Sequence, residues 1–254
     1  MSTITQLYRY PIKGMSPEAL QRITLQAGEA IKLDRHFALA HGTTEFNPHA
    51  PQHLSKTHFL MLMKNERLAA LHTVYDDSTG VLRIERDGKV LARGNLENSE
   101  GRQKIENFFI EYLRDEIRGA PKLVQAPEHT FSDVNAKVLS CINLATVRDL
   151  EKVLGTTIHP LRFRANVYFD GAPPWAELDW VNKEFMLGTA KVRGFKLTER
   201  CAATNVNPQT AARDLQIPQS LLKTYGHRHL GIYMQVTENG EVALNDELKE
   251  ESHV

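Results

Sequence analysis

The sequence predicts an α+β fold that is mostly β, in which a small β-rich N-terminal domain packs on a domain dominated by a β-barrel with a few helices. Three observations support this prediction. Alternating and β-prone residues fill much of residues 4–100, apolar residues at helical spacing interrupt them over 101–119, and strand-like segments return after residue 161. We divide the chain where the pattern changes, into domains 1–115 and 116–254.

The first domain is expected to contain two early strands and a hairpin. The segment "ITQLYRYPI" alternates and ends at a proline, and "LQRITLQAGE" runs into a glycine turn. In "VLRIERDGKVLARG", Asp87 and Gly88 supply the two positive φ angles that a tight hairpin turn needs. A long polar loop with two prolines, "HGTTEFNPHAPQHLSKTH", separates these elements.

Three helices are expected. In "GRQKIENFFIEYLRDEIRG" the apolar side chains recur every three to four residues, and Gly119 should end the helix. In "NLATVRDLEKVLG", Asn143 can cap the helix and Gly155 can stop it. The short helix "PQSLLKTYG" has a proline near its start and Gly226 at its end.

The C-terminal half is expected to return to strands. They are "LRFRANVYFD", "EFMLGTAKVRGFKLT" and a hairpin, "GIYMQVTENGEVAL", that turns at Asn239 and Gly240. Within the first of these strands, Arg162 and Arg164 would point to the same face. Two arginines on one face require anions or water there, because an unpaired buried charge is costly.

Composition excludes several classes of protein. The 254 residues contain 31 Lys+Arg and 31 Asp+Glu, so the chain lacks the broad basic field of a non-specific nucleic-acid binder. No apolar stretch approaches the roughly 20 residues of a membrane span, and the start shows no signal-peptide pattern. The two cysteines form neither a disulfide framework nor a C-x-x-C metal motif. We therefore expect a cytoplasmic protein that binds neither nucleic acid nor membrane.

Cys201, in "LTERCAATNVNP", has two interpretations. Free cysteine is often a small buried hydrophobe, and Cys141 in "VLSCINL" fits that description well. Cys201 instead follows Arg200 in a polar, turn-like segment, and a neighbouring cation favours the thiolate that attacks or ligates. A cysteine hydrolase would need a nearby histidine such as His227 or His229. The loop histidines His41, His49, His53 and His58 have irregular spacing and favour a solvated loop over a metal cluster.

Basic residues in apolar or turn contexts form a second group of candidates. Lys13 and Gly14 follow "YRYPI", and Arg35 precedes an apolar segment. With Arg162 and Arg164, these side chains can make surface salt bridges, which contribute little to stability. Alternatively they clamp a phosphate or a polyoxygenated ligand, for which the guanidinium fork is well suited.

The motifs together resemble a known family. Over residues 161–211 an "FRxN" segment precedes a "WAExxW"-like stretch, a glycine-containing strand and "RC" before a "TxVxP" turn. This resembles the MOSC domain, the sulfurase C-terminal module of molybdenum-cofactor proteins. The front segment "LYRYPIKGM…ITLQAGEAIKLDRHFALAHG" resembles the N-terminal β-barrel that precedes MOSC domains. The pairing, over about residues 3–248, is similar to the amidoxime-reducing component group and its bacterial relatives.

The resemblance implies a site for the molybdenum cofactor. Cys201 matches the cysteine that ligates molybdenum and is the expected catalytic residue. The cofactor contacts it implies are Lys13, Gly14, Arg35, Asp133, Asn135, Arg164, Asn166, Arg200 and Tyr233. The chain departs from the family in Gly14, often serine in relatives, in Val134, which lacks a hydroxyl, and in Glu199. Loop 42–58 lacks the basic "R-Q-x-P" stretch of relatives, for which Lys56 is a weak substitute.

The expected function is therefore a molybdenum-dependent oxidoreductase that takes oxygen from N-hydroxylated or N-oxygenated compounds. Some relatives carry a C-terminal 2Fe–2S domain that is not in this sequence, so a separate flavin or iron–sulfur reductase is the expected electron donor. The family also has a general association with pyridoxal phosphate. A sulfur or cofactor carrier with a Cys201 persulfide remains an alternative, and a Cys–His hydrolase is a third.

Overall fold

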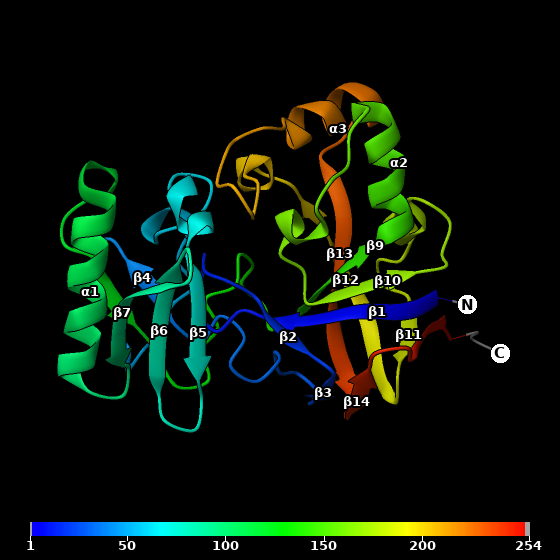
Figure 1. The fold of residues 1–254 in the computed structure, drawn as a ribbon. Helices are drawn as coiled ribbons and strands as arrows, with labels where there is room; N and C mark the ends of the chain where they lie inside the picture. The colour runs from blue at the N-terminus through cyan, green and yellow to red at the C-terminus, as the bar shows by residue number, and fades with distance from the viewer. Residues whose placement is uncertain (1, 252–254) are drawn as a thin grey trace.

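The computed structural model, which describes residues 2–251, contains a closed β-barrel (Figure 1). Each barrel strand pairs with the next, and the last pairs with the first. In spatial order the strands are β1 (Ser2–Arg9), β10 (Val167–Asp170), β9 (Leu139–Asn143), β13 (His229–Glu238), β12 (Ala190–Glu199), β11 (Glu184–Leu187) and β15 (Glu247–Glu250). The prediction of a mostly β fold with a barrel is thus confirmed.

The first strand of the chain belongs to this barrel. In β1, Ile4 lies opposite Phe169 of β10, and Thr3 lies opposite Glu247 of β15. The short strand β2 (Glu18–Leu20) pairs with the last three residues of β1, Leu7–Arg9. The N-terminal segment therefore crosses from one unit to the other, and the proposed division at residues 115 and 116 stays a prediction.

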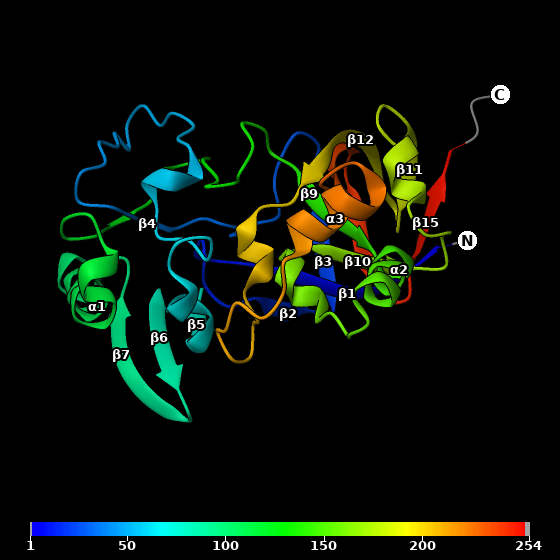
Figure 2. The same cartoon turned by 90° about the horizontal axis from the view of Figure 1, so that it is seen from above.

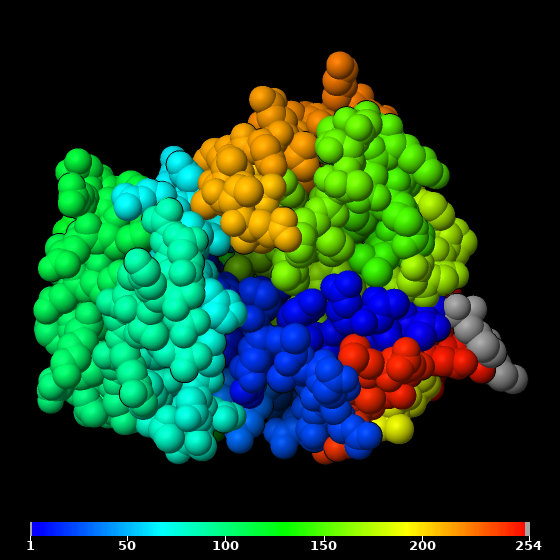
Figure 3. All heavy atoms as spheres, in the orientation of Figure 1, coloured from blue at the N-terminus to red at the C-terminus, as the bar shows by residue number. Residues whose placement is uncertain are grey.

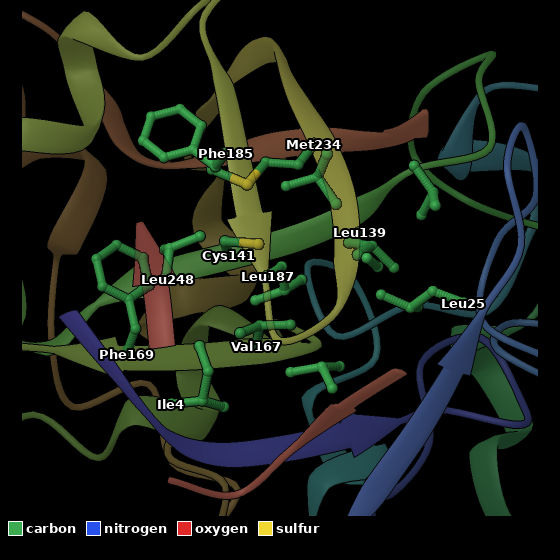
Figure 4. Packing of buried hydrophobic residues seen from close by; sticks show 14 of the residues in the cluster. Ile4, Leu25, Leu139, Cys141, Val167, Phe169, Phe185, Leu187, Met234 and Leu248 are labelled. Atoms are coloured by element: carbon green, nitrogen blue, oxygen red, sulfur yellow. The ribbon is translucent and has the colours of Figure 1, made fainter. Parts of the chain in front are cut away.

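The interior of the barrel is apolar and contains Cys141. Figure 4 shows this thiol among the side chains of Leu139, Leu187, Met234 and their neighbours. Cys141 is fully buried, as predicted, and burial raises the pKa of its thiol to about 12. Each fully buried aliphatic or aromatic side chain contributes about 1.5–3 kcal/mol relative to its exposed state, so this cluster is a main source of stability.

The second unit is a three-stranded sheet of β5 (His72–Asp76), β6 (Val81–Arg86) and β7 (Lys89–Asn95), which helix α1 (Ser99–Leu113) covers (Figures 1 and 2). The predicted hairpin turn is confirmed, since Asp87 and Gly88 have φ angles of 51° and 73°. The helix lies very close to β7, because a Cβ at Gly101 would be only 2.0 Å from the carbonyl oxygen of Asn95.

The helices begin and end largely where local signals place them. Asn143 caps α2 (Leu144–Leu154) by accepting a hydrogen bond from Ala145 N at 3.0 Å, and Gly155 ends it with a φ of 65°. Helix α3 (Ile217–Tyr225) ends at Gly226 in the same conformation. The first helix is shorter than predicted, because the chain leaves helical geometry at Arg114 (φ 49°) and forms the short turn η3 (Arg114–Glu116).

The predicted strand over residues 161–170 is correct only in its second half. Residues Pro160–Phe163 form a 3-10 turn, η4, and Arg164 adopts a left-handed conformation with a φ of 52° before β10 begins. The hydroxyl of Tyr168 fixes this turn by donating to Pro160 O at 3.1 Å and accepting from Ala165 N at 3.0 Å. The prediction that Arg162 and Arg164 share a strand face is therefore wrong.

The predicted hairpin over residues 231–244 is also wrong. Strand β14 (Gly240–Ala243) does not fold back on β13 but pairs with β3 (Arg22–Leu25). Gly240 lets the chain pass directly over the start of β12, since a Cβ there would lie 2.4 Å from Ala190 N. A two-residue turn signal cannot distinguish this crossing from a hairpin, because both need a residue without a side chain.

The remaining elements are short. They are β4 (Ala38–Ala40), β8 (Lys122–Val124) and the 3-10 turns η1 (Lys56–His58), η2 (Glu66–Ala70), η5 (Ala176–Asp179) and η6 (Ala202–Asn205). The predicted polar loop from His41 is irregular up to η1, as expected. Among residues 2–251, no helix combines the length and the apolar character needed to cross a membrane.

Candidate functional site

A cavity lies between the barrel and the N-terminal unit, and Cys201 is on its wall. Nine residues expected from the family resemblance, Cys201 among them, line this cavity, although they come from six separate segments of the chain. They are Lys13, Gly14, Arg35, Asp133, Arg164, Asn166, Arg200, Cys201 and Tyr233. Asn135 is exposed and does not line this cavity.

Cys201 occupies the short extended link between β12 and η6. Its carbonyl oxygen accepts hydrogen bonds from Thr204 N at 3.0 Å and from Thr204 Oγ1 at 2.9 Å. These bonds hold the backbone, whereas the half-buried thiol is free and lies at the cavity. A cysteine placed in this way can act as a ligand or a nucleophile, unlike the enclosed Cys141.

Arg200 lies directly behind Cys201 and is almost fully buried. Its Nε donates to Leu230 O at 2.7 Å and its Nη1 to Phe163 O at 3.1 Å, but its buried Nη2 has no hydrogen-bond partner within residues 2–251. Burial lowers the pKa of Arg200, although an arginine remains charged at neutral pH. Gly231 makes room for this guanidinium, because a Cβ there would be 3.0 Å from Nη2.

Two further guanidinium groups lie against the ring of Tyr10. The Cζ atom of Arg164 is 4.4 Å from the ring centroid, and that of Arg35 is 4.8 Å away. Arg35 is ion-paired with Asp34 and donates to Arg164 O at 2.8 Å. The guanidinium of Arg164 has no hydrogen-bond acceptor among residues 2–251, and burial lowers its pKa. The planar guanidinium of Arg164 can therefore donate hydrogen bonds to a ligand in the cavity.

Other predicted residues are already occupied by partners within the protein. Buried Lys13 is ion-paired with Asp133 and donates to Phe131 O at 2.8 Å. Burial alone would raise the pKa of Asp133, but the charge of Lys13 outweighs it and lowers the pKa to about 2. Arg162 is ion-paired with Asp214 at 2.5 Å. These cations are neutralised before any ligand arrives.

A second crevice opens beside the first. Its lining residues come from 14–17, 68–72, 161–164 and 206–209, and it shares Gly14, Leu62, Arg162 and Arg164 with the Cys201 cavity. Figure 3 shows a hollow where the blue, cyan and gold segments meet. Arg164 therefore stands at the junction of two openings between the units.

The candidate histidines lie in different surroundings, since His49 and His58 are exposed as predicted and His41 is not. Neither His227 nor His229 lines the cavity that contains Cys201. His41 is buried and its Nδ1 accepts from Arg118 N at 3.3 Å, so it is not part of a solvated loop as predicted. Within residues 2–251, no group of three or more His, Cys, Asp or Glu side chains is arranged to hold a metal ion.

Sequence reasoning undervalued Lys56 and missed Tyr10. Lys56 lies on the cavity wall beside Cys201, although it is 145 residues away in sequence. Tyr10 is fully buried and carries both guanidinium groups on its ring. A lysine in a polar loop segment and a tyrosine directly after β1 gave no local signal of either role.

Comparison with known proteins identifies the family. Residues 1–119 match the MOSC N-terminal beta barrel domain, and residues 127–249 match the MOSC domain. Together the two matches cover nearly the whole chain, so the protein belongs to the MOSC-domain proteins that carry the N-terminal barrel domain.

The chain is also similar to individual proteins. Mouse (Mus musculus) mitochondrial amidoxime-reducing component 1 is 30% identical over 117 residues, which is 46% of this chain and 34% of the mouse protein. The chain therefore matches about a third of the length of that curated relative. The YUAD protein of Bacillus subtilis has a TM-score of 0.47 at 13% identity over 100% of this chain and 98% of its own. YiiM of Geobacillus stearothermophilus has a TM-score of 0.36 at 18% identity, over 45% of this chain and 54% of its own. At such TM-scores neither structure adds to the argument.

Proposed function

We propose that this protein is a molybdenum-cofactor oxidoreductase that reduces N-hydroxylated or N-oxygenated compounds, with Cys201 as the one protein ligand of the metal. Its family is associated with this cofactor, and the mouse relative is an amidoxime-reducing component. The observation that carries the proposal is the free thiol of Cys201 in a cavity with two guanidinium groups, Arg164 and Arg200, that retain unused donors.

The donor set fits such a group. A soft thiolate suits a transition metal, but no second or third protein ligand accompanies Cys201 in the described part of the chain. A metal held here therefore needs most of its ligands from a non-protein molecule. A cofactor that brings its own sulfur ligands meets this requirement.

The cations fit the anionic parts of the cofactor. The guanidinium fork of Arg164 can bind two oxygens of a phosphate group, and the buried Nη2 of Arg200 would gain a partner from any nearby anion. The guanidinium of Arg35 lies close by but is held by Asp34. In this proposal Arg164 is the main phosphate-binding residue, and Arg200 adds positive charge behind Cys201.

The chain itself would orient the reactants and control protons. When bound, the cofactor supplies the two-electron and oxygen-atom chemistry. The walls of the cavity come from both units and surround the half-buried side chain of Cys201. Burial raises the pKa of Tyr233, and the charge of Asp133 adds to this effect, so the phenol keeps its proton at neutral pH. Tyr233 can therefore hold a proton at its Oη on the cavity wall. The electrons would come from a separate flavin or iron–sulfur reductase.

Metal and pterin content tests the proposal. Wild type, Cys201→Ala and the control Cys141→Ala are purified from a host that makes the cofactor, and molybdenum is measured by mass spectrometry and pterin by fluorescence after oxidation. We expect near-stoichiometric molybdenum in wild type and in the control, and its loss in Cys201→Ala. Wild type that contains neither molybdenum nor pterin would overturn the proposal, and a persulfide on Cys201 in that protein would indicate a sulfur carrier.

Reduction of an N-hydroxylated compound by the loaded protein is the second part of this test. A chemically reduced viologen dye can replace the unknown electron donor, and its oxidation is followed by absorbance. Substrate-dependent oxidation that Cys201→Ala abolishes is the expected result. Cytoplasmic location, the reductase partner and pyridoxal phosphate binding stay predictions.

A further inference from the structure

The loop that carries Lys56 is anchored, although its sequence is polar. Phe46 and Leu54 pack on a small buried cluster that contains Phe59 and Phe131. The ring centroids of Phe46 and Phe131 are 5.3 Å apart, as are those of Phe59 and Phe131. These contacts attach both halves of the loop to the N-terminal unit.

Hydrogen bonds then fix the turn η1 around Lys56. The carbonyl oxygen of His58 accepts from His41 N at 2.9 Å and from Thr44 Oγ1 at 3.0 Å, while Arg118 Nη2 donates to Thr57 O. Because the residues that follow Lys56 are held in this way, its side chain begins from a defined position at the cavity.

Lys56 and Cys201 line the same cavity. Burial lowers the pKa of Lys56, but the sulfur of Cys201 and the carboxylate of Asp133 outweigh burial and raise this pKa overall. Lys56 is half-buried and has no ion-pair partner among residues 2–251, since Asp133 is paired with Lys13. Glu199, another carboxylate on the cavity wall, forms no ion pair with it. The positive charge at the thiol is therefore not neutralised by a salt bridge.

We propose that Lys56 is a specificity-determining residue that biases the site toward substrates with a negative charge next to the reducible N–O group. The inference rests on the proposed function, because it places the reacting oxygen near Cys201. An anionic substrate gains attraction to Lys56, a neutral one gains none, and a cationic one is repelled. Arg164 and Arg200 do not replace Lys56 here, since the proposed cofactor uses their donors.

Alkylation of Cys201 tests the charge effect without any turnover. The reagents are anionic iodoacetate and neutral iodoacetamide, used on full-length protein from a host that lacks the cofactor. Both react with the same thiolate, so the ratio of their rate constants cancels any change in thiolate fraction. Fully buried Cys141 should stay unmodified, which peptide mass spectrometry checks.

We expect Lys56→Gln to lower the iodoacetate-to-iodoacetamide rate ratio about tenfold. A factor of this size corresponds to the interaction energy of two opposite charges a few ångströms apart at a partly exposed site. The matched control Lys122→Gln removes an exposed lysine outside the cavity and should leave the ratio unchanged. A ratio that is the same in wild type and in Lys56→Gln would overturn the inference.

Turnover gives the second measurement, on protein loaded with molybdenum. Propionamidoxime and 3-amino-3-(hydroxyimino)propanoate share a reducible group, and the second has a carboxylate one carbon away from that group. We expect Lys56→Gln to reduce the preference for the carboxylated compound about tenfold in kcat/KM, mainly through KM. If both compounds are reduced and the preference is the same in wild type and in Lys56→Gln, this inference alone is overturned. If loaded protein reduces neither compound, the proposed function itself fails.

Discussion

Asn166 joins three strands of the barrel through its contact with Ser140. Its Oδ1 accepts from Ser140 N at 3.1 Å and from Ser140 Oγ at 2.9 Å, and its Nδ2 donates to Tyr8 O at 3.2 Å. Strands β9, β10 and β1 therefore meet at one buried amide group. The resemblance to the family predicts a cofactor contact for Asn166, but its amide is already engaged within the protein.

Replacing this amide should destabilise the fold. Asn166→Ala leaves Ser140 N and Tyr8 O without their buried partner, and each lost bond of this kind costs about 1–3 kcal/mol. We expect the free energy of unfolding in urea to fall by about 2–4 kcal/mol. The control Asn135→Ala changes an exposed asparagine of the same predicted set, and it should shift stability by less than about 0.5 kcal/mol. Equal stability of the two variants would contradict the role assigned to Asn166.

Gly231 should tolerate no side chain. Its φ is 83°, and a Cβ there would lie 2.6 Å from Cys141 O and 3.0 Å from Arg200 Nη2. We expect Gly231→Ala to lose at least about 2 kcal/mol of stability, from backbone strain and overpacking together. Thermal unfolding followed by circular dichroism measures this loss.

Gly226→Ala provides a matched control for Gly231→Ala. It also has a positive φ, of 77°, but nothing lies within 4 Å of its Cβ position. Its cost should therefore come from backbone strain alone and be smaller. If the two alanine variants unfold at the same temperature, crowding around Arg200 is not the reason that position 231 is glycine.

Glu177 should make stability depend on pH. It is fully buried, and its Oε2 accepts from Thr146 Oγ1 at 2.9 Å and Asn143 Nδ2 at 3.2 Å. Burial raises the pKa of this carboxyl above its ordinary value of 4.5. A raised pKa means that the folded state binds the proton more tightly, so its contribution is complete below pH 4.5 and is lost as the pH rises through the raised value.

The comparison of wild type with Glu177→Gln isolates this contribution. The free energy of unfolding of wild type minus that of the variant should decrease from pH 4.5 upward and then level off, as measured by urea unfolding at each pH. Asp179→Asn, in the same turn but exposed, serves as the control. A difference that increases with pH for Glu177→Gln would show that the carboxylate, not the neutral acid, is the favoured buried form.

Arg213 should hold the two units together beside the site. Its Nη2 donates to Met63 O at 2.9 Å and lies 2.9 Å from a carboxylate oxygen of Glu66, while its Nη1 donates to Ala202 O at 3.2 Å. We expect Arg213→Met to raise amide hydrogen exchange in residues 62–66 and 202–206, and to cost about 1–3 kcal/mol of stability. Arg93→Met, on an exposed strand position, should change neither. Unchanged exchange in Arg213→Met would exclude this linking role.

Local sequence signals were reliable where a structure forms from neighbouring residues. Asn143 and Gly155 mark the two ends of α2, and Asp87-Gly88 makes the hairpin turn, as predicted. Such features depend on backbone angles and hydrogen bonds within a few residues. The same reasoning failed at Asn239-Gly240, where the partner of the following strand is β3, more than 200 residues earlier.

The sequence by itself determined the mostly β class, the ends of α2 and α3, the core position of Cys141 and, through its motifs, the membership of the family. Only the tertiary structure decided which cations are free. Lys13 is neutralised by Asp133, whereas Arg164 and Lys56 have no ion-pair partner beside the cavity in the described part of the chain. The physical reason is that charge pairing depends on distances of a few ångströms. Closure of the barrel by β1 and β10 brings together side chains that are more than a hundred residues apart in the sequence.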